Sequence, residues 1–480
     1  MKETLNKLRA AAPLPSRGGA GVGSVISLLL LLTLGTSAVA QGAEMESATE
    51  AVKNMGLGWN LGNTLDTNSG DTLNMWIERW TSRRPQDYET AWGQPVTTPA
   101  LMKMMKDAGF NAIRVPVTWY PHMDAKFSFT GNSTVWYPSQ DNIGTKIKAA
   151  WMKRVHEIVD YVISNGMYCI LNIHHDTGAA NTAWLIADEA VYEQQRKRFE
   201  AVWRQIANEF KNYGDHLLFE GYNEMLDVKR SWCFASFNAD GQYDAAIATS
   251  AYNAINAYAQ SFVDVVRSTG GNNAQRNLIV TTYGACCGAG SWNSHLQDPL
   301  KKMKLPEDEA VDHLLFEVHS YPDITNLSYA KTELRTTLNN LNKNLASKGA
   351  PVIIGEWGTL GENDYEEHRA NYLAFSRYFV EQAKQRGFAT FHWMGLSDGD
   401  ARAVPEFNQP DRLEAIVKGY YGEEGYINGI ASPLTPHPSV QGDLQSPLYD
   451  LQGRQIVNRE SVNRKLSRGI YIQKGRKILH

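Results

Sequence analysis

Eight short apolar segments recur along this 480-residue chain, and each is followed by a longer stretch of helical or loop character. Apolar runs of this length are typical of strands that are buried on both faces of a parallel sheet. Strands that alternate with helices predict an α/β fold, and eight repeats favour a closed (β/α)₈ TIM barrel over an open sheet. The expected strands are Gly56–Asn60, Asn111–Val117, Tyr168–His174, Leu217–Asn223, Asn277–Tyr283, Leu314–His319, Pro351–Glu356 and Ala389–Trp393.

Helix signals support this alternation. Thr98 followed by Pro99 supplies a cap residue and a first-turn proline, which is typical of a helix start. Between the next strands, apolar residues repeat at intervals of three and four, as in Trp151, Val155 and Ile158. No Gly-x-Gly-x-x-Gly follows the first strand, which argues against a dinucleotide-binding sheet.

The two ends of the chain differ from its centre. An apolar run at 25–34 follows basic residues and precedes Ala38-Val39-Ala40, which is typical of a secretory signal peptide over residues 1–40. The run is shorter than the roughly 20 residues that span a bilayer, and an uncleaved anchor is the alternative. Residues 41–430 are the expected catalytic domain. Residues 431–446, rich in Pro and Ser, predict a linker, and 447–480 predict a small C-terminal β appendage.

Charge excludes one class of ligand. Residues 1–40 carry +3 and residues 441–480 carry +5, which leaves −12 for residues 41–440 of the total of −4. An acidic central domain repels nucleic acid, so we expect a neutral substrate and no nucleic-acid partner. The four cysteines lack the spacing of a zinc site, and a bridge from Cys233 to Cys286 or Cys287 stays open.

Two glutamates each close an apolar run: Glu224 follows the expected fourth strand, and Glu356 ends the seventh. All strands of a barrel end at one rim, so residues distant in sequence can face one another there. Paired carboxylates are the minimal equipment for hydrolysing a glycosidic bond, and a separation of about 5–5.5 Å gives retention of configuration. A single strand-end glutamate is more often structural, so the prediction depends on the pair and its neighbours.

The neighbours suggest which glutamate does what. Arg114 lies on an expected strand near the rim, where a guanidinium needs an acidic partner. Beside Glu356 it would lower the carboxyl pKa and keep a nucleophile ionised. Glu224 would then be the acid/base, and the amide of Asn223 is suitably placed to bind a sugar hydroxyl.

Further polar groups lie at strand ends. His319 and Tyr321, two residues apart, are expected to share one face, with Tyr321 donating to the nucleophile and His319 orienting the acid. His174-His175-Asp176 could suggest a metal, but no third ligand at suitable spacing accompanies it. We therefore expect a polar or sugar-binding cluster and no metal.

Aromatic residues offer apolar planes for sugar rings. Trp393 ends the last expected strand and is the first candidate for stacking on a pyranose. Five tryptophans in predicted rim loops are as well explained by loop packing as by sugar stacking: Trp76, Trp80, Trp92, Trp136 and Trp184.

Over roughly residues 50–425 the sequence resembles glycoside hydrolase family 5, the clan A retaining β-glycanases. The resemblance implies that Glu224 is the acid/base and Glu356 the nucleophile, and that no cofactor takes part. The matching motifs are Gly56–Asp66, Arg114, Asn172-Ile-His174-His175, Asn223-Glu224, His319 and Tyr321, Gly355-Glu356-Trp357 and Trp393. By the same resemblance, Arg114, His174, Asn223, His319, Tyr321 and Trp393 bind substrate or support the site, and His175 is a further subsite residue.

The opening motif is most similar to bacterial endo-β-1,4-glucanases, so we expect a secreted cellulase acting on β-glucan polysaccharide or oligosaccharide by double displacement. Met225 follows Glu224 where many relatives have proline, and 394–398 also departs from the common pattern. These changes concern subsites, so xyloglucan, mixed-linkage glucan and mannan are alternative substrates, and transglycosylation is a weaker one. A catalytically silent carbohydrate-binding barrel is the alternative of another class.

The C-terminal tail carries its own resemblance. Pro447–Arg454 and Arg468–Arg476 predict two hairpin pieces with glycine turns. The tail resembles the sorting domain of the type IX secretion system of Bacteroidetes, which implies a secreted or cell-surface protein that meets secretion machinery. A β appendage without a transport role is the alternative.

Overall fold

The computed structural model describes residues 45–71, 75–124, 128–130, 133–135, 144–237, 242–360, 365–425, 448–449, 470–473 and 476–479. Eight parallel strands close into a barrel in the order β1-β10-β9-β8-β7-β6-β5-β2. Their bounds are β1 Leu57–Asn60, β2 Ala112–Val115, β5 Tyr168–Asn172, β6 Leu217–Glu220, β7 Leu278–Cys286, β8 Leu314–Ser320, β9 Val352–Trp357 and β10 Ala389–Trp393. The predicted (β/α)₈ barrel and its eight strands are confirmed.

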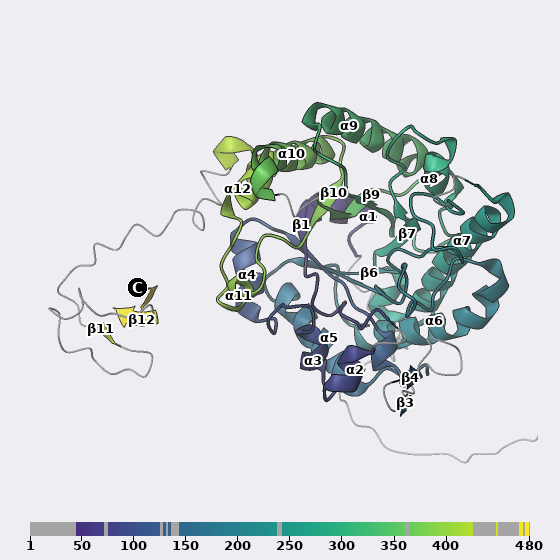
Figure 1. Ribbon diagram of the computed structural model, residues 1–480, viewed down its shortest axis with the longest axis horizontal. Coiled ribbons are helices and arrows are strands. Elements are labelled where there is room, and N and C mark those ends of the chain that lie inside the picture. Colours follow the sequence, from purple (N-terminus) through teal and green to yellow (C-terminus); the bar gives the residue numbers. More distant parts are fainter. Residues whose placement is uncertain are drawn as a thin grey trace, which may run out of the picture. The chain divides into compact units, whose positions relative to one another are not determined.

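Helices surround the barrel as a ring, apart from the first one along the chain, which covers one end of it (Figure 1). They are α1 Ala48–Met55, α2 Trp76–Trp80, α3 Pro85–Glu89, α4 Pro99–Asp107, α5 Ala149–Ile163, α6 Glu189–Glu209, α7 Ala245–Ser268, α8 Asp298–Lys302, α9 Leu327–Asn344, α10 Tyr365–Gln385, α11 Asp400–Ala403 and α12 Pro410–Gly425. The predicted start of α4 is confirmed with Pro99 in its first turn, although Thr98 forms no side-chain cap hydrogen bond. The predicted apolar face of α5 is buried, Trp151, Val155 and Ile158 included.

The interior of the barrel has two layers. Alternate residues of a strand point to the same side, so an inward residue is followed by another two positions later. The first layer is apolar and is formed by residues such as Ala112, Ile170, Leu218, Ile279, Leu315 and Ile353. Two positions on, towards the carboxyl ends of the strands, the buried residues are Arg114, Asn172, Glu220, Thr281, Glu317 and Gly355. The sequence thus places an apolar base beneath a polar layer.

Helix α1 covers the amino-terminal end of the barrel. Its N-cap Ser47 accepts a hydrogen bond from the Glu50 backbone N–H. Ala51, Val52 and Met55 are buried and belong to the same apolar cluster as the lower barrel layer. The helix therefore completes the core at the end of the barrel opposite the carboxyl ends of the strands.

The remaining described strands form small antiparallel sheets. β3 (Ser128–Thr130) pairs with β4 (Ser133–Val135). β11 (Leu448–Tyr449), β12 (Ile470–Gln473) and β13 (Arg476–Leu479) form a three-stranded sheet where a C-terminal β appendage was expected. The expected signal peptide (1–40) and linker (431–446) lie outside the described residues. Within the described residues, no helix combines the length and the apolar character needed to cross a membrane.

Candidate active site at the carboxyl ends of the strands

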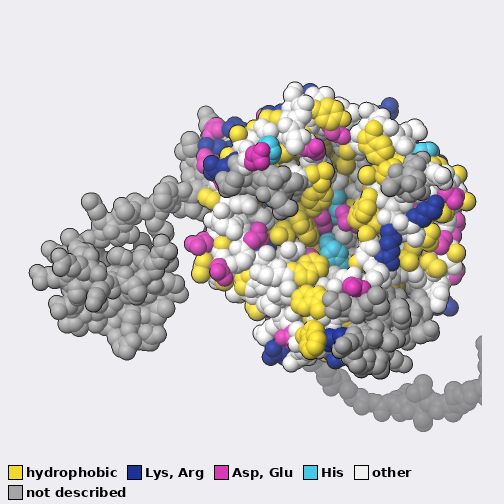
Figure 2. Space-filling view, viewed as in Figure 1, with side chains coloured by type: hydrophobic (Ala, Val, Ile, Leu, Met, Phe, Trp, Pro, Cys, Tyr) yellow, Lys and Arg dark blue, Asp and Glu magenta, His cyan; other side chains and the backbone are white. Residues whose placement is uncertain are grey.

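The face at the carboxyl ends of the strands is hollowed, with histidine and acidic side chains on its floor and apolar side chains along its rim (Figure 2). Strand ends supply the floor because the polar layer of the barrel lies directly beneath it. The nine predicted site residues lie on or just after barrel strands: Arg114 (β2), His174 and His175 (after β5), Asn223 and Glu224 (after β6), His319 (β8), Tyr321 (after β8), Glu356 (β9) and Trp393 (β10).

Arg114 is the centre of the polar layer and is fully buried. Its Nε and Nη2 donate to the two carboxylate oxygens of Glu220 at 2.6 and 2.7 Å. Its Nη1 donates to Glu356 Oε1 at 2.7 Å, and Glu317 Oε1 lies 3.2 Å from Nε. Asn60 and Asn223 also accept hydrogen bonds from this guanidinium. The Arg114 guanidinium therefore contacts three buried carboxylates and two side-chain amides.

Glu356 is held on both oxygens. Oε1 accepts from Arg114, and Oε2 accepts from the Tyr321 hydroxyl at 2.6 Å. His319 Nδ1 lies 3.5 Å from Oε2. Burial raises the pKa of Glu356, while His319 and Arg114 oppose that rise. Arg114 lowers this pKa as expected, but burial acts more strongly, so the net pKa of Glu356 is raised.

Glu224 is held more loosely and is more open. Its side chain is 22% exposed, and Oε1 pairs with His319 Nδ1 at 2.8 Å. One carboxylate oxygen of Glu224, one of Glu356 and a nitrogen of His319 all lie within 4.8 Å of one another. Inverting glycosidases need about 6.5–9.5 Å between their carboxyl groups so that water fits between them. The approach of one oxygen from each glutamate to within 4.8 Å favours the retaining arrangement, in which the carboxyl groups are about 5–5.5 Å apart.

Asn223 is fixed beside the pair. Its Oδ1 accepts a hydrogen bond from Arg114 at 2.8 Å, and the residue is 2% exposed. Because the oxygen is used by the guanidinium, the amide nitrogen is the group that can donate to a sugar hydroxyl.

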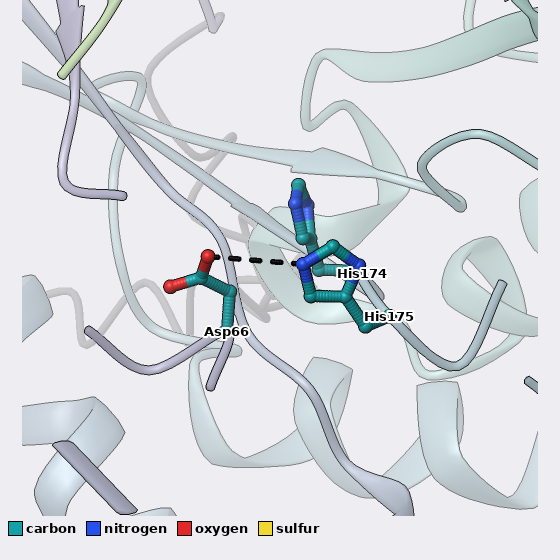
Figure 3. Close-up of side chains that lie close together, drawn as sticks. All are labelled: Asp66, His174 and His175. Carbon is teal, nitrogen blue, oxygen red and sulfur yellow. Dashed lines mark ion pairs between the residues drawn. The ribbon is translucent and has the colours of Figure 1, made fainter. Parts of the chain in front are cut away.

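A second group of residues lies near β1, β5 and β10, and reaches the first group where His174 Nε2 lies 3.9 Å from Glu356 Oε1. His174 stacks parallel to Trp393, with ring centroids 5.8 Å apart. His175 Nε2 lies 3.9 Å from Asp66 Oδ2, the pair joined by the dashed line in Figure 3. Burial lowers the pKa of both histidines and raises that of Asp66. Gly62 leaves room for the Trp393 ring, since a Cβ there would lie 2.9 Å from it.

Two clusters bring three ligand-type atoms together within the described residues: Asp66 with His174 and His175, and Glu224 with His319 and Glu356. The expectation that no third ligand-type group accompanies His174 and His175 was wrong, because the fold brings Asp66 beside them from a distant part of the sequence. His174 Nδ1 is bonded to Asn172, and His319 Nδ1 to Glu224. The geometry fits a site that binds sugars through neutral and hydrogen-bonded groups.

Sequence reasoning missed two buried acids, Glu220 and Glu317. Both occur in the same four-residue pattern, Leu217-Leu-Phe-Glu220 and Leu314-Leu-Phe-Glu317. A charged residue within an otherwise apolar strand has to face a partner, so the repeated pattern was the signal that could have found them. Both are fully buried and both pair with Arg114.

Several open sequence expectations are decided by burial. Trp184 is buried and donates to Asp176, and both Asp176 oxygens accept from protein groups, so these residues pack the loop. Trp92 lies beside His175 with ring centroids 5.5 Å apart, whereas Trp80 is 78% exposed. Trp136 lies outside the described residues. All four cysteines are free, so neither bridge from Cys233 is formed.

The Arg114 hub predicts a large stability effect. Changing Arg114 to Met leaves three buried carboxylates without their cation, and removing one partner of a buried ion pair costs about 3–5 kcal/mol. Stranded carboxylates bind protons more readily in the folded state, so this loss should shrink as pH falls from 8 to 5. Urea unfolding at both pH values measures it.

A matched control is Arg154→Met, which removes the cation from the buried Glu89 and from the partly exposed Glu157, both outside the barrel. We expect that variant to lose stability while it keeps its catalytic rate. If Arg114→Met is as stable at pH 8 as the wild type, Arg114 does not stabilise the three buried carboxylates as proposed.

Comparisons with known proteins agree with this geometry. The sequence profile of the family "Cellulase (glycosyl hydrolase family 5)" matches residues 78–398. Endoglucanase B of Neocallimastix patriciarum is 33% identical over 415 residues, which cover 82% of this chain and 76% of that protein. Endoglucanase A of Clostridium longisporum is 33% identical over 394 residues, covering 79% and 67%.

Solved structures give the same result. A GH5-4 broad specificity endoglucanase from an uncultured bacterium is 54% identical with a TM-score of 0.71, covering 79% of this chain and 97% of that one. A family 5 enzyme of Prevotella bryantii, solved with a xyloglucan tetradecasaccharide, is 40% identical with a TM-score of 0.66, covering 78% and 99%. A lichenase of a Caldicellulosiruptor species, solved with cellotetraose, is 29% identical with a TM-score of 0.62, covering 79% and 97%.

Proposed function

Because this chain belongs to glycoside hydrolase family 5, a family of retaining glycoside hydrolases, we propose that Glu356 is its nucleophile and Glu224 its acid/base. The enzyme hydrolyses internal β-1,4 bonds of glucan. The observation that carries the proposal is the approach of the two carboxylates to within 4.8 Å beside one histidine.

In the first step, Glu356 attacks the anomeric carbon while Glu224 donates a proton to the leaving oxygen. Tyr321 and Arg114 support this assignment, because each donates to a different Glu356 oxygen and together they fix its direction. The more exposed Glu224 faces the side from which the leaving chain departs. The product of this step is a glycosyl ester on Glu356, with the reducing-end fragment released.

In the second step, Glu224 removes a proton from water, and that water attacks the same carbon from the side the leaving group had occupied. Glu356 leaves as a carboxylate and recovers its hydrogen bonds from Arg114 and Tyr321. Two inversions at one carbon give net retention. Asn223 is placed to donate to a hydroxyl of the bound sugar throughout, and Trp393, His174 and His175 bind the sugar near β1, β5 and β10.

A broader substrate range is the second candidate. The 54% identical neighbour is described as a broad specificity endoglucanase, and the Prevotella bryantii enzyme was solved with xyloglucan. Xyloglucan and mixed-linkage glucan share the β-1,4-glucan backbone, so the same pair of glutamates suits them. We propose activity on these polymers in addition to cellulose-type glucan, and mannan as a weaker substrate.

We also propose that the protein is exported from the cell. The apolar run at 25–34 with its basic flank and small-residue end supports a cleaved signal peptide, and the hairpin-like tail supports type IX secretion. A protein with both signals acts outside the cell or on its surface, where polysaccharide is met. Deleting residues 447–480 and measuring the secreted fraction in a Bacteroidetes host tests the role of the tail.

Hydrolysis of a glycan panel tests the function. Purified protein is incubated with carboxymethylcellulose, mixed-linkage β-glucan, xyloglucan, mannan and cello-oligosaccharides, and products are sized by chromatography. We expect short oligosaccharides from the β-1,4-glucans, and the β-anomer first when cleavage of a cello-oligosaccharide is followed by ¹H NMR. An α-anomer that appears first would contradict the mechanism. Intact polymers throughout would contradict the glucanase assignment.

A further inference from the structure

Glu317 is buried beneath the site and contacts two of its residues, Arg114 and His319. The residue is on β8 and is fully buried. Its Oε1 lies 3.2 Å from Arg114 Nε and 3.4 Å from His319 Nε2. Its Oε2 accepts a hydrogen bond from the Thr281 hydroxyl at 2.9 Å. The carboxylate is thus held in place by three groups, two of which belong to the proposed catalytic layer.

The neighbouring strand makes room for this carboxylate. A Cβ on Gly355 would lie 1.5 Å from Glu317 Oε1, so only glycine fits at that position of β9. Gly355, directly before Glu356, therefore has no side chain because Glu317 occupies the space that a Cβ would need. The backbone of Gly355 is fixed as well, since its carbonyl accepts from Asn60 Nδ2 at 2.9 Å.

His319 has an acidic group at each ring nitrogen. Nδ1 faces Glu224 Oε1 at 2.8 Å, and Nε2 faces Glu317 Oε1 at 3.4 Å. Nδ1 makes a hydrogen bond with Glu224, whereas Nε2 and Glu317 Oε1 form an ion-pair contact without hydrogen-bond geometry. Two carboxylates facing the ring favour the imidazole that carries a proton on each nitrogen, because carboxylates accept protons and hydrogen bonds and do not donate them. A neutral ring would leave one of the two nitrogens without a proton to offer.

We propose that Glu317 is a positioning residue that keeps His319 doubly protonated, so that its Nδ1–H stays directed at Glu224 and Glu356 through both chemical steps. The imidazolium stabilises each glutamate while it is a carboxylate: Glu224 between donating its proton to the leaving oxygen and taking one from water, and Glu356 as it leaves the sugar. The consequence for turnover rests on the function proposed above. The protonation of His319 does not.

The charges around His319 agree with this role. Burial by itself would lower the pKa of His319, but Glu356, Glu224 and Glu317 together raise it to about 10. The titratable and charged groups that face it come from several elements: Glu317 (β8), Tyr321 (after β8), Glu356 (β9), Glu224 (after β6), His174 (after β5), Arg114 (β2) and Cys286 (β7). Three of these groups are acids that contact the ring directly, and Glu317 is the one that takes no part in bond making.

The test compares Glu317→Gln with Glu220→Gln. Glutamine keeps an oxygen for Arg114 in either place and removes one negative charge from the same guanidinium. Glu220, however, does not contact His319, so it is the matched control. An opposite charge at this distance moves a pKa by about one to three pH units, and its loss from His319 should move the titration downward.

The first readout is the protonation of His319, followed in ¹⁵N-histidine-labelled full-length protein by imidazole ¹⁵N shifts from pH 5 to 10. His319→Asn assigns the signal. We expect two protons on wild-type His319 up to at least pH 8, a titration at least about one pH unit lower in Glu317→Gln, and less than half that change in Glu220→Gln. A singly protonated wild-type ring at pH 7, or equal shifts in the two variants, overturns the proposal. The wild-type measurement stands even if a variant fails to fold.

The second readout is kcat against pH on an aryl cellobioside with a good leaving group, for which the second step limits turnover. Loss of the imidazolium should make kcat of Glu317→Gln fall on the basic side about one pH unit earlier than in Glu220→Gln. If kcat falls at the same basic pH in both variants, the proposed role of Glu317 in turnover is wrong. A wild type that hydrolyses no glycoside would refute the proposed function, and the NMR result would still decide the state of His319.

Discussion

Changing Glu356 to Gln is expected to lower kcat on cello-oligosaccharides by at least about 10⁴-fold, because removal of an attacking nucleophile removes the covalent route itself. The amide keeps the volume of the side chain and still accepts a hydrogen bond from Arg114. Its oxygen is too weak a nucleophile to form the glycosyl ester. Steady-state kinetics on a soluble oligosaccharide measures the loss, and circular dichroism verifies that the barrel is folded.

A covalent label gives this prediction a second readout. A 2-fluoro cellobioside with a good leaving group should add one glycosyl mass to the wild type, and peptide mapping should place that mass on Glu356. The matched control is Glu89→Gln, the same exchange at a buried carboxylate that pairs with Arg154 outside the barrel. We expect it to label and turn over within a few-fold of the wild type. More than about 1% residual activity in Glu356→Gln, or a label elsewhere, would refute the assignment.

The second large effect is expected at the other glutamate. Changing Glu224 to Ala should cost about 10²–10⁴-fold on natural β-glucan, since the leaving oxygen then departs without a proton. On an aryl glycoside with a good leaving group, the first step needs little acid, so the glycosyl-enzyme should accumulate. Stopped-flow measurement should then show a burst followed by a slow steady state.

Azide separates the two roles. A small anion that needs no general base can enter the space left by Glu224 and attack the glycosyl ester, so azide should restore turnover of Glu224→Ala and give a β-glycosyl azide. Glu224→Gln is the control that keeps the side-chain volume, and azide should help it less. An α-azide from Glu224→Ala together with a β-azide from a Glu356 variant would show that the two roles are reversed, because azide inverts the centre when it replaces a nucleophile and retains it when it attacks the glycosyl-enzyme.

The sequence was sufficient for the barrel and for the pairing of Glu224 with Glu356. Apolar runs identify strands whose two faces are covered, and all strands of such a barrel share one rim, so strand-end residues can be grouped without coordinates. The contacts of Tyr321 with Glu356 and of His319 with Glu224 were expected from their spacing, and the structure has both. Their roles in catalysis remain predictions for the experiments above.

Other features could not be predicted because they depend on competing magnitudes or on packing. Burial raises the pKa of Glu356 and two cations lower it, and the sequence does not show which of these effects is larger. Glu220 and Glu317 were overlooked because each lies inside an apolar run, where the partner that makes such burial tolerable is distant in sequence. Trp184 and Trp92 lie in similar loops, and only the fold shows that the first is covered and the second lies beside His175.

Helix α1 has a practical consequence for producing this protein in shortened form. The segment before it is tied to three barrel elements: Tyr168 Oη donates to Glu46 Oε2 at 2.7 Å, Asn277 Nδ2 donates to the Glu46 carbonyl at 2.9 Å, and Ala48 N donates to the Asp312 carbonyl at 2.6 Å. A recombinant gene that begins near residue 44 keeps α1 and its contacts at the amino-terminal end of the barrel. One that begins after Met55 lacks α1 and would leave the apolar lower layer of the barrel open to water. The safe start of a shortened gene is therefore set by the amino-terminal end of the barrel and not by the active site.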